Sequence, residues 1–104
     1  MTSEELQATA FQIISCSGDS FADFYEAVEE ALDGNYNRAQ ELIQSGEKTV
    51  IAAHKAQTDL LVAEASGEEL NFGIIMIHAQ DHLMTTMNYQ RIAKQMIKIC
   101  ERLK

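Results

Sequence analysis

The segment IIMIHAQDHLMT, residues 74–85, combines apolar residues around most of a helix with two histidines and an aspartate on one side of it. Side chains three and four positions apart are neighbours on a helix, so His78, Asp81 and His82 form one cluster. Polar and charged groups are costly in apolar surroundings unless they are paired. A neutral imidazole can serve as nucleophile, base or metal ligand near neutral pH. We therefore predict that this cluster carries the function.

Apolar residues recur every three to four positions on both sides of this segment, which predicts three long helices. The sequence has no proline and only 5 glycines, so residues that break helices are scarce. The first helix follows a capping box in which Thr2 is the cap and Glu5 lies three residues on. Turn signals at residues 33–35 and 66–67 separate the helices, and acidic residues at positions 68–69 are expected to open the third.

The lengths of these segments indicate how the helices are arranged. Each predicted helix has about 30 residues and is therefore ~45 Å long. Long helices joined by short turns are antiparallel neighbours. We predict that residues 1–104 form a single all-α domain, an antiparallel up-down-up three-helix bundle. Gly18 and Gly46 lie inside predicted helices, and we expect a kink at the first and local weakening at the second.

The third predicted helix has more apolar surface than a three-helix monomer needs. It carries two apolar stripes, roughly 140° apart by helical rotation. The stripe on the His78 side consists of Ile74, Tyr89, Ile92, Met96, Ile99 and Leu103. The other stripe consists of Met76, Ala79, Leu83 and Met87. A helix that is apolar on more than one face is buried on more than one face, so we predict self-association through this helix, with the histidine cluster in or beside the interface.

The composition excludes some classes of partner. The 16 acidic residues outnumber the 8 basic ones, giving a formal net charge of -8. Nucleic acids and anionic membranes bind basic surfaces, so neither is an expected partner. No apolar run is long enough to cross a bilayer, and the N-terminus does not resemble a signal peptide, so no membrane insertion is expected. Cys16 and Cys100 fit no disulfide or metal spacing, and we predict free thiols in a cytoplasmic protein.

Three roles are compatible with the residues of the cluster. His78 and His82 could be core or interface residues whose hydrogen bonds are satisfied. Histidines four positions apart are also a common zinc-ligand geometry, although no further Cys or Glu is placed to complete a closed site. The third role is a nucleophilic histidine, flanked by groups that orient it and neutralise charge on a transferred group. The spacing alone does not distinguish the last two.

Three short motifs resemble those of a known family. The octet HAQDHLMT at residues 78–85 resembles the signature of the enzyme IIA component of the lactose/cellobiose-type sugar phosphotransferase system. The segments AHKAQT at residues 53–58 and EASG at 64–67 resemble two further motifs of that family. The resemblance covers essentially the whole chain. Two departures, the basic stretch at 91–94 and the pair Ser20-Phe21, lie outside the octet.

The resemblance implies a phosphotransferase component with a phosphohistidine intermediate. By this resemblance His78 accepts a phosphoryl group from phospho-HPr and passes it to a cysteine of the cognate enzyme IIB, during uptake of a β-linked disaccharide. His82 and Gln80 are then candidate hydrogen-bond donors to the phosphate oxygens. Gln80 lies on the far side of an ideal helix from His78, so its role would need a subunit interface or a partner.

The resemblance also implies a homotrimer, in which the Asp81 carboxylates gather around the threefold axis on a divalent cation, with Mg²⁺ as the expected ion. Three converging carboxylates repel one another without a counter-charge, which makes such an ion physically reasonable. We expect His54 to form a hydrogen bond between helices. The alternative function is a structural or metal-binding helical trimer without transfer chemistry.

Overall fold

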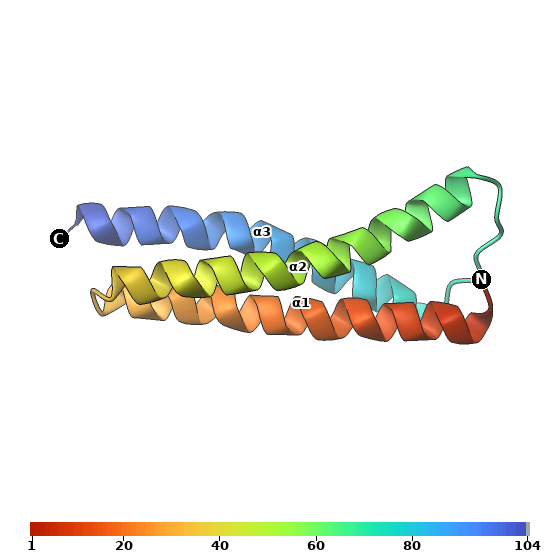
Figure 1. The fold of residues 1–104 in the computed structure, drawn as a ribbon, viewed down its shortest axis with the longest axis horizontal. Coiled ribbons are helices and arrows are strands. Elements are labelled where there is room, and N and C mark those ends of the chain that lie inside the picture. The colour runs from red at the N-terminus through yellow and green to blue at the C-terminus, as the bar shows by residue number, and fades with distance from the viewer. Residues whose placement is uncertain (104) are drawn as a thin grey trace.

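The computed structural model describes residues 1–103, which form three α-helices joined by two connections. These helices are α1 (Ser3–Leu32), α2 (Tyr36–Ala65) and α3 (Ile74–Arg102). Figure 1 shows an elongated bundle in which α2 runs antiparallel to α1 and α3, and its extents are 53 × 20 × 19 Å. The all-α, up-down-up arrangement predicted from the sequence is confirmed.

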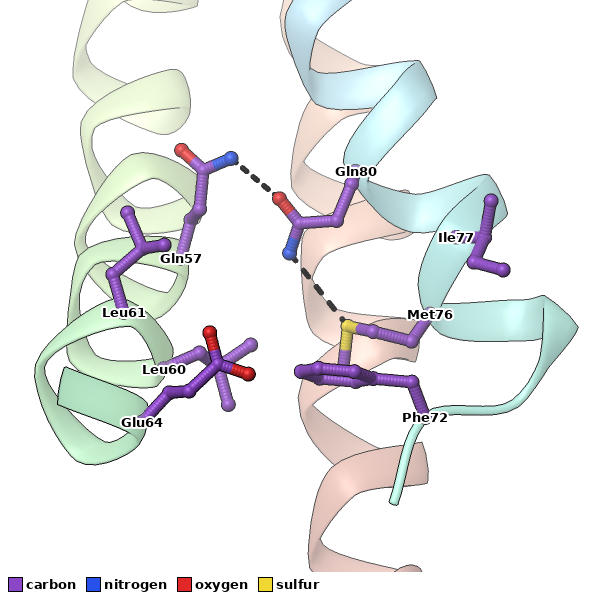
Figure 2. Close-up of a pocket in the computed structure, with 8 residues that line it drawn as sticks. All are labelled: Gln57, Leu60, Leu61, Glu64, Phe72, Met76, Ile77 and Gln80. Atoms are coloured by element: carbon purple, nitrogen blue, oxygen red, sulfur yellow. Dashed lines mark hydrogen bonds between the residues drawn. The ribbon is translucent and has the colours of Figure 1, made fainter. Parts of the chain in front are cut away.

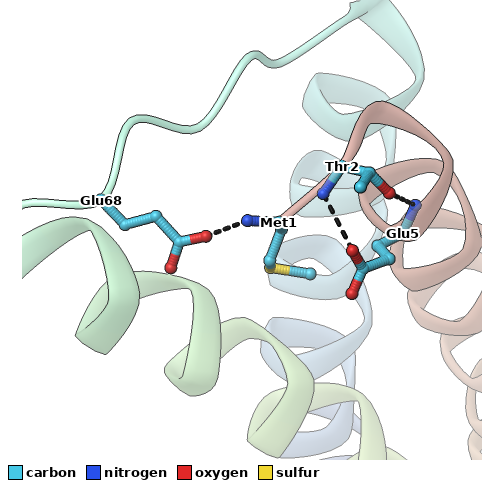
Figure 3. Close-up of polar contacts among 4 residues, drawn as sticks. All are labelled: Met1, Thr2, Glu5 and Glu68. Atoms are coloured by element: carbon cyan, nitrogen blue, oxygen red, sulfur yellow. Dashed lines mark hydrogen bonds and ion pairs between the residues drawn. The ribbon is translucent and has the colours of Figure 1, made fainter.

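The start of α3 differs from the prediction. The helix begins at Ile74, after the cap Gly73, and the acidic pair at 68–69 belongs to the preceding connection. Gly67 adopts a left-handed conformation with φ +95°, which ends α2 and redirects the chain. Glu68 then accepts a hydrogen bond from the amino group of Met1, so its carboxylate ties the connection to the N-terminus (Figure 3).

The predicted capping box at the start of α1 is present. The Thr2 hydroxyl accepts a hydrogen bond from the Glu5 backbone N–H at 3.1 Å, and the Glu5 carboxylate accepts one from the Thr2 backbone N–H at 3.0 Å (Figure 3). The hydrogen bonds from the Thr2 backbone and side chain lower the pKa of the Glu5 carboxyl, because they stabilise its charged form. Local sequence therefore determines where α1 begins.

The central element of the bundle is α1, which packs extensively against both other helices, whereas α2 and α3 contact each other much less. In Figure 1 the C-terminal part of α2 diverges from the rest of the bundle. The buried apolar residues come from all three helices, with Phe24, Ile13, Leu83 and Ile97 as the largest fully buried apolar side chains.

Both internal glycines lie within unbroken helices. In α1 the helix continues through Gly18, and in α2 it continues through Gly46. A methyl group at Gly46 would lie 2.5 Å from Phe24 Cε1, so the glycine makes room for that buried ring. Beside it, the Ser20 hydroxyl donates to the Gly46 carbonyl oxygen at 2.9 Å. Gly46 is therefore a contact point between α1 and α2.

The structure distinguishes the two apolar stripes of α3. Met76, Ala79 and Leu83 are buried inside the bundle. The stripe on the His78 side is mostly exposed, with Ile74 at 80% and Ile99 at 55% of full exposure. One chain thus leaves an apolar face of α3 without a covering helix, and this face is the candidate surface for the predicted self-association.

Candidate functional site

The two histidines of the octet lie one turn apart on α3. The His78 ring is exposed and the His82 ring is half-buried. Their ring centroids are 6.1 Å apart and the ring planes are inclined by only 19°. A group bonded to a nitrogen of His78 would therefore lie within reach of the neighbouring imidazole. The structure thus brings together the two histidines of the predicted three-residue cluster.

The half-buried position of His82 results from its contact with α1. Its Nε2 atom lies 3.7 Å from the position that a Cβ atom would occupy at Gly18. One turn further along α3, the buried Thr86 hydroxyl donates to the Ser17 carbonyl oxygen at 3.3 Å. Local sequence patterns do not reveal these contacts, because the partners are separated by more than 60 positions in the chain. The site is thus formed by α3 and the middle of α1.

Gln80 points to the other side of α3, as its position on an ideal helix predicts. Its side-chain oxygen accepts a hydrogen bond from Gln57 Nε2 on α2, and its own Nε2 contacts Met76 Sδ at 3.7 Å (Figure 2). Gln80 lies at the edge of a largely apolar groove of about 260 Å³ between α2 and the start of α3. The structure therefore separates Gln80 from the two histidines within one chain.

Asp81 is exposed on the face of α3 that no helix of the same chain covers. Its neighbours one turn away, Ile77 and Met84, are also exposed, at 61% and 44%. Within residues 1–103 no three His, Cys, Asp or Glu side chains are grouped closely enough to hold a metal ion. A closed zinc site inside one chain is thus not formed by His78 and His82. A carboxylate is a ligand that suits Mg²⁺, and Asp81 is the carboxylate of the octet on this exposed face.

His54 is exposed on α2. Its carbonyl oxygen accepts a hydrogen bond from the Thr58 hydroxyl at 3.0 Å, but its ring makes no hydrogen bond within residues 1–103. The expected hydrogen bond from His54 to another helix is therefore wrong for a single chain.

An aromatic cluster that the sequence analysis did not predict joins α1 and α3, towards the C-terminal end of α3 from the histidines. The Phe21 ring is 4.9 Å from that of Tyr89 and 6.4 Å from that of Tyr25, between ring centroids. Burial, with smaller contributions from Tyr25 and Glu29, raises the pKa of the Tyr89 hydroxyl. Phe21 and Tyr25 are four residues apart on α1, so their contact follows from helical spacing, whereas the contact of Phe21 with Tyr89 depends on the packing of α1 against α3.

Comparisons with known proteins decide the family. The family model described as PTS system, Lactose/Cellobiose specific IIA subunit matches residues 8–101. The chain belongs to this IIA family. The lactose-specific EIIA component of Staphylococcus epidermidis is 38% identical over 99 residues, which is 95% of each chain.

Solved structures of IIA proteins share the fold. The crystal structure of PtcA from S. mutans superimposes with a TM-score of 0.95 at 44% identity, covering 97% of this chain and 99% of that one. The IIA(Chitobiose) protein of Escherichia coli, solved in complex with HPr, gives a TM-score of 0.80 at 25% identity, covering 94% of this chain and 95% of that one.

Within residues 1–103, no helix is long and apolar enough to cross a membrane.

Proposed function

We propose that this IIA protein is a phosphoryl carrier, in which His78 accepts a phosphoryl group from HPr and passes it to a cysteine of the cognate enzyme IIB during uptake of a β-linked disaccharide. The observation that carries the proposal is the exposed His78 ring on α3, with the His82 ring parallel to it at 6.1 Å. Membership of the IIA family and likeness to a IIA protein solved with HPr support this assignment.

The transfer chemistry needs little from the protein beyond positioning. In the first step the lone pair of a neutral His78 nitrogen attacks phosphorus, an N–P bond forms, and the bond to the donor breaks with its electron pair left on the donor. In the second step a cysteine thiolate of the acceptor attacks the same phosphorus, and the electron pair of the broken N–P bond returns to His78. Because the imidazole is neutral, it needs no base to activate it.

The neighbouring residues have distinct proposed roles. His82 donates a hydrogen bond to the phosphoryl oxygens, because its ring lies beside that of His78. Gln80 is held on the opposite side of α3 by Gln57, so we propose that it donates to the phosphoryl group of a neighbouring subunit. Both roles depend on donors that are oriented before the charge arrives.

The assembly that we propose is a homotrimer about α3. The support for it is the exposed apolar face of this helix, which contains Ile77, Met84 and the single carboxylate of Asp81. Three copies would bring three carboxylates together, and oxygen ligands of this kind suit Mg²⁺. When bound, the cation neutralises the repulsion among them.

Phosphorylation with defined components tests the proposal. The chain is incubated with phosphoenolpyruvate, enzyme I and HPr, and the acid-labile phosphate is located by mass spectrometry. We expect the label on His78, its loss in His78→Ala, and its retention in His54→Ala, a matched control that removes an exposed histidine from α2. Addition of enzyme IIB should discharge the label. A wild-type chain that gains no phosphate would instead favour the structural or metal-binding trimer.

A further inference from the structure

We propose that Gly18 is a positioning residue of the transfer site, because a side chain larger than a methyl group at this position would compete with the His82 ring for the space beside His78. The inference rests on the proposed function. It concerns a residue of α1, whereas the chemistry is assigned to α3.

Gly18 differs in its surroundings from the three glycines that lie outside the helices. Gly34 and Gly67 have positive φ and end helices, and a Cβ at Gly73 would meet nothing within 4 Å. Gly18 has an ordinary helical backbone in the middle of α1, where glycine lowers helix stability relative to alanine. Backbone freedom therefore does not account for this glycine, and what distinguishes the position is its close approach to α3. Outside the neighbouring residues of α1 itself, His82 Nε2 is the one atom of residues 1–103 within 4 Å of a Cβ placed at Gly18, at 3.7 Å.

Two buried hydrogen bonds next to Gly18 fix the position of α1 relative to α2 and α3. On one side the buried Thr86 hydroxyl donates to the Ser17 carbonyl oxygen at 3.3 Å, which joins α1 to α3. On the other side the buried Ser20 hydroxyl donates to the Gly46 carbonyl oxygen at 2.9 Å, which joins α1 to α2. Both bonds are within three residues of Gly18. A side chain added there would therefore displace the half-buried ring more readily than the helix.

The effect should increase with the size of the added side chain. At 3.7 Å an alanine methyl is in ordinary van der Waals contact with Nε2 and restricts the ring only slightly. Valine adds two γ carbons on a stiff β-branched side chain, with few rotamers available in a helix. Its γ carbons compete with the ring for space and turn His82 away from His78. Valine is at least as good a helix former as glycine, so the bundle stays folded.

The experiment measures phosphoryl transfer from phospho-HPr to wild type, Gly18→Ala, Gly18→Val, His82→Ala and the double variant Gly18→Val/His82→Ala. We expect Gly18→Val to lower the rate on the order of 10²-fold, as His82→Ala does, and the double variant to be no slower than either. Gly18→Ala should show a much smaller loss. Ala22→Val is the matched control, because Ala22 is exposed one turn further along α1 and should transfer at the wild-type rate.

A spectroscopic measurement separates a positioning role from general damage. Nitrogen-15 NMR of the imidazole rings should show a shifted His82 resonance in Gly18→Val, with an unchanged His54 resonance as internal reference. Gly18→Val that transfers normally, or a double variant whose loss multiplies the two single losses, would overturn the inference. So would an unshifted His82 resonance. If the wild type gains no label on His78, the proposed function fails, and the His82 resonance still decides whether Gly18 seats the ring.

Discussion

Replacing Gly46 by alanine tests the packing between α1 and α2. The added Cβ would lie 2.5 Å from Phe24 Cε1 and 2.9 Å from Cδ1 and Cζ. Favourable carbon–carbon contacts occur at about 3.5–4.0 Å, so three ring atoms would overlap with the methyl group. Phe24 is fully buried and cannot swing into solvent. The helices must therefore separate, which also stretches the 2.9 Å hydrogen bond from Ser20 to the Gly46 carbonyl.

The size of the effect follows from opposing contributions. Overpacking of a core costs about 1–3 kcal/mol. A weakened buried hydrogen bond adds on the order of 1 kcal/mol. Alanine is the better helix former, which returns about 1 kcal/mol. We therefore expect Gly46→Ala to lower the free energy of unfolding by about 1–3 kcal/mol, despite the gain in helix propensity.

Urea unfolding followed by circular dichroism, at one protein concentration because association affects apparent stability, measures this change. Gly18→Ala is the matched control, since its methyl meets His82 Nε2 at an ordinary 3.7 Å. That variant should be more stable than wild type by about 0.5–1 kcal/mol. Phe24→Leu should recover part of the loss when combined with Gly46→Ala. A Gly46→Ala variant as stable as wild type would refute the packing argument.

Two further changes test buried polarity and assembly. The Ser17 hydroxyl is buried and has no hydrogen-bond partner within residues 1–103, so Ser17→Ala should leave stability unchanged or raise it. Ser20→Ala should lower stability by about 0.5–1.5 kcal/mol, because the hydrogen bond from the Ser20 hydroxyl to the Gly46 carbonyl oxygen is lost. Equal losses in urea unfolding would contradict this difference. If Asp81 lies on a trimer axis, a chelator should loosen the assembly, and Asp81→Leu should tighten it by about 1.5–3 kcal/mol per buried side chain. Sedimentation and thermal unfolding of both forms test this, and a monomeric wild type or a dissociated leucine variant would place the axis elsewhere.

Features that depend on neighbouring residues were predictable from the sequence. The capping box of Thr2 and Glu5 and the spacing of apolar residues predicted the helices and their order. Helical rotation placed Gln80 away from His78, as the structure has it. The start of α3 was predicted six residues early, because the acidic residues at 68–69 look like a helix start but lie in the connection after Gly67.

Features that depend on tertiary contact were not predictable from the sequence. Local propensity describes Gly18 and Gly46 as weak points, and only the fold shows that one faces His82 and the other faces Phe24. The hydrogen bond expected from His54 to another helix also depends on tertiary contact, and its ring forms none within residues 1–103. The assembly, and the position of Asp81 within it, depend on contacts between chains and stay proposals.

The contact between α1 and His82 has a consequence for how the chain folds. The two contacting residues are 64 positions apart, and the Thr86–Ser17 hydrogen bond spans 69 positions. The hairpin of α1 and α2, joined by a short turn, needs only local chain closure, whereas α3 reaches α1 only after the whole of α2 has been bridged. A newly made or partly unfolded chain therefore lacks the arrangement around His82 until its last helix has docked. Under the proposed function, competence to exchange phosphate would then belong to the completely folded chain alone, and incomplete chains would not compete for the donor.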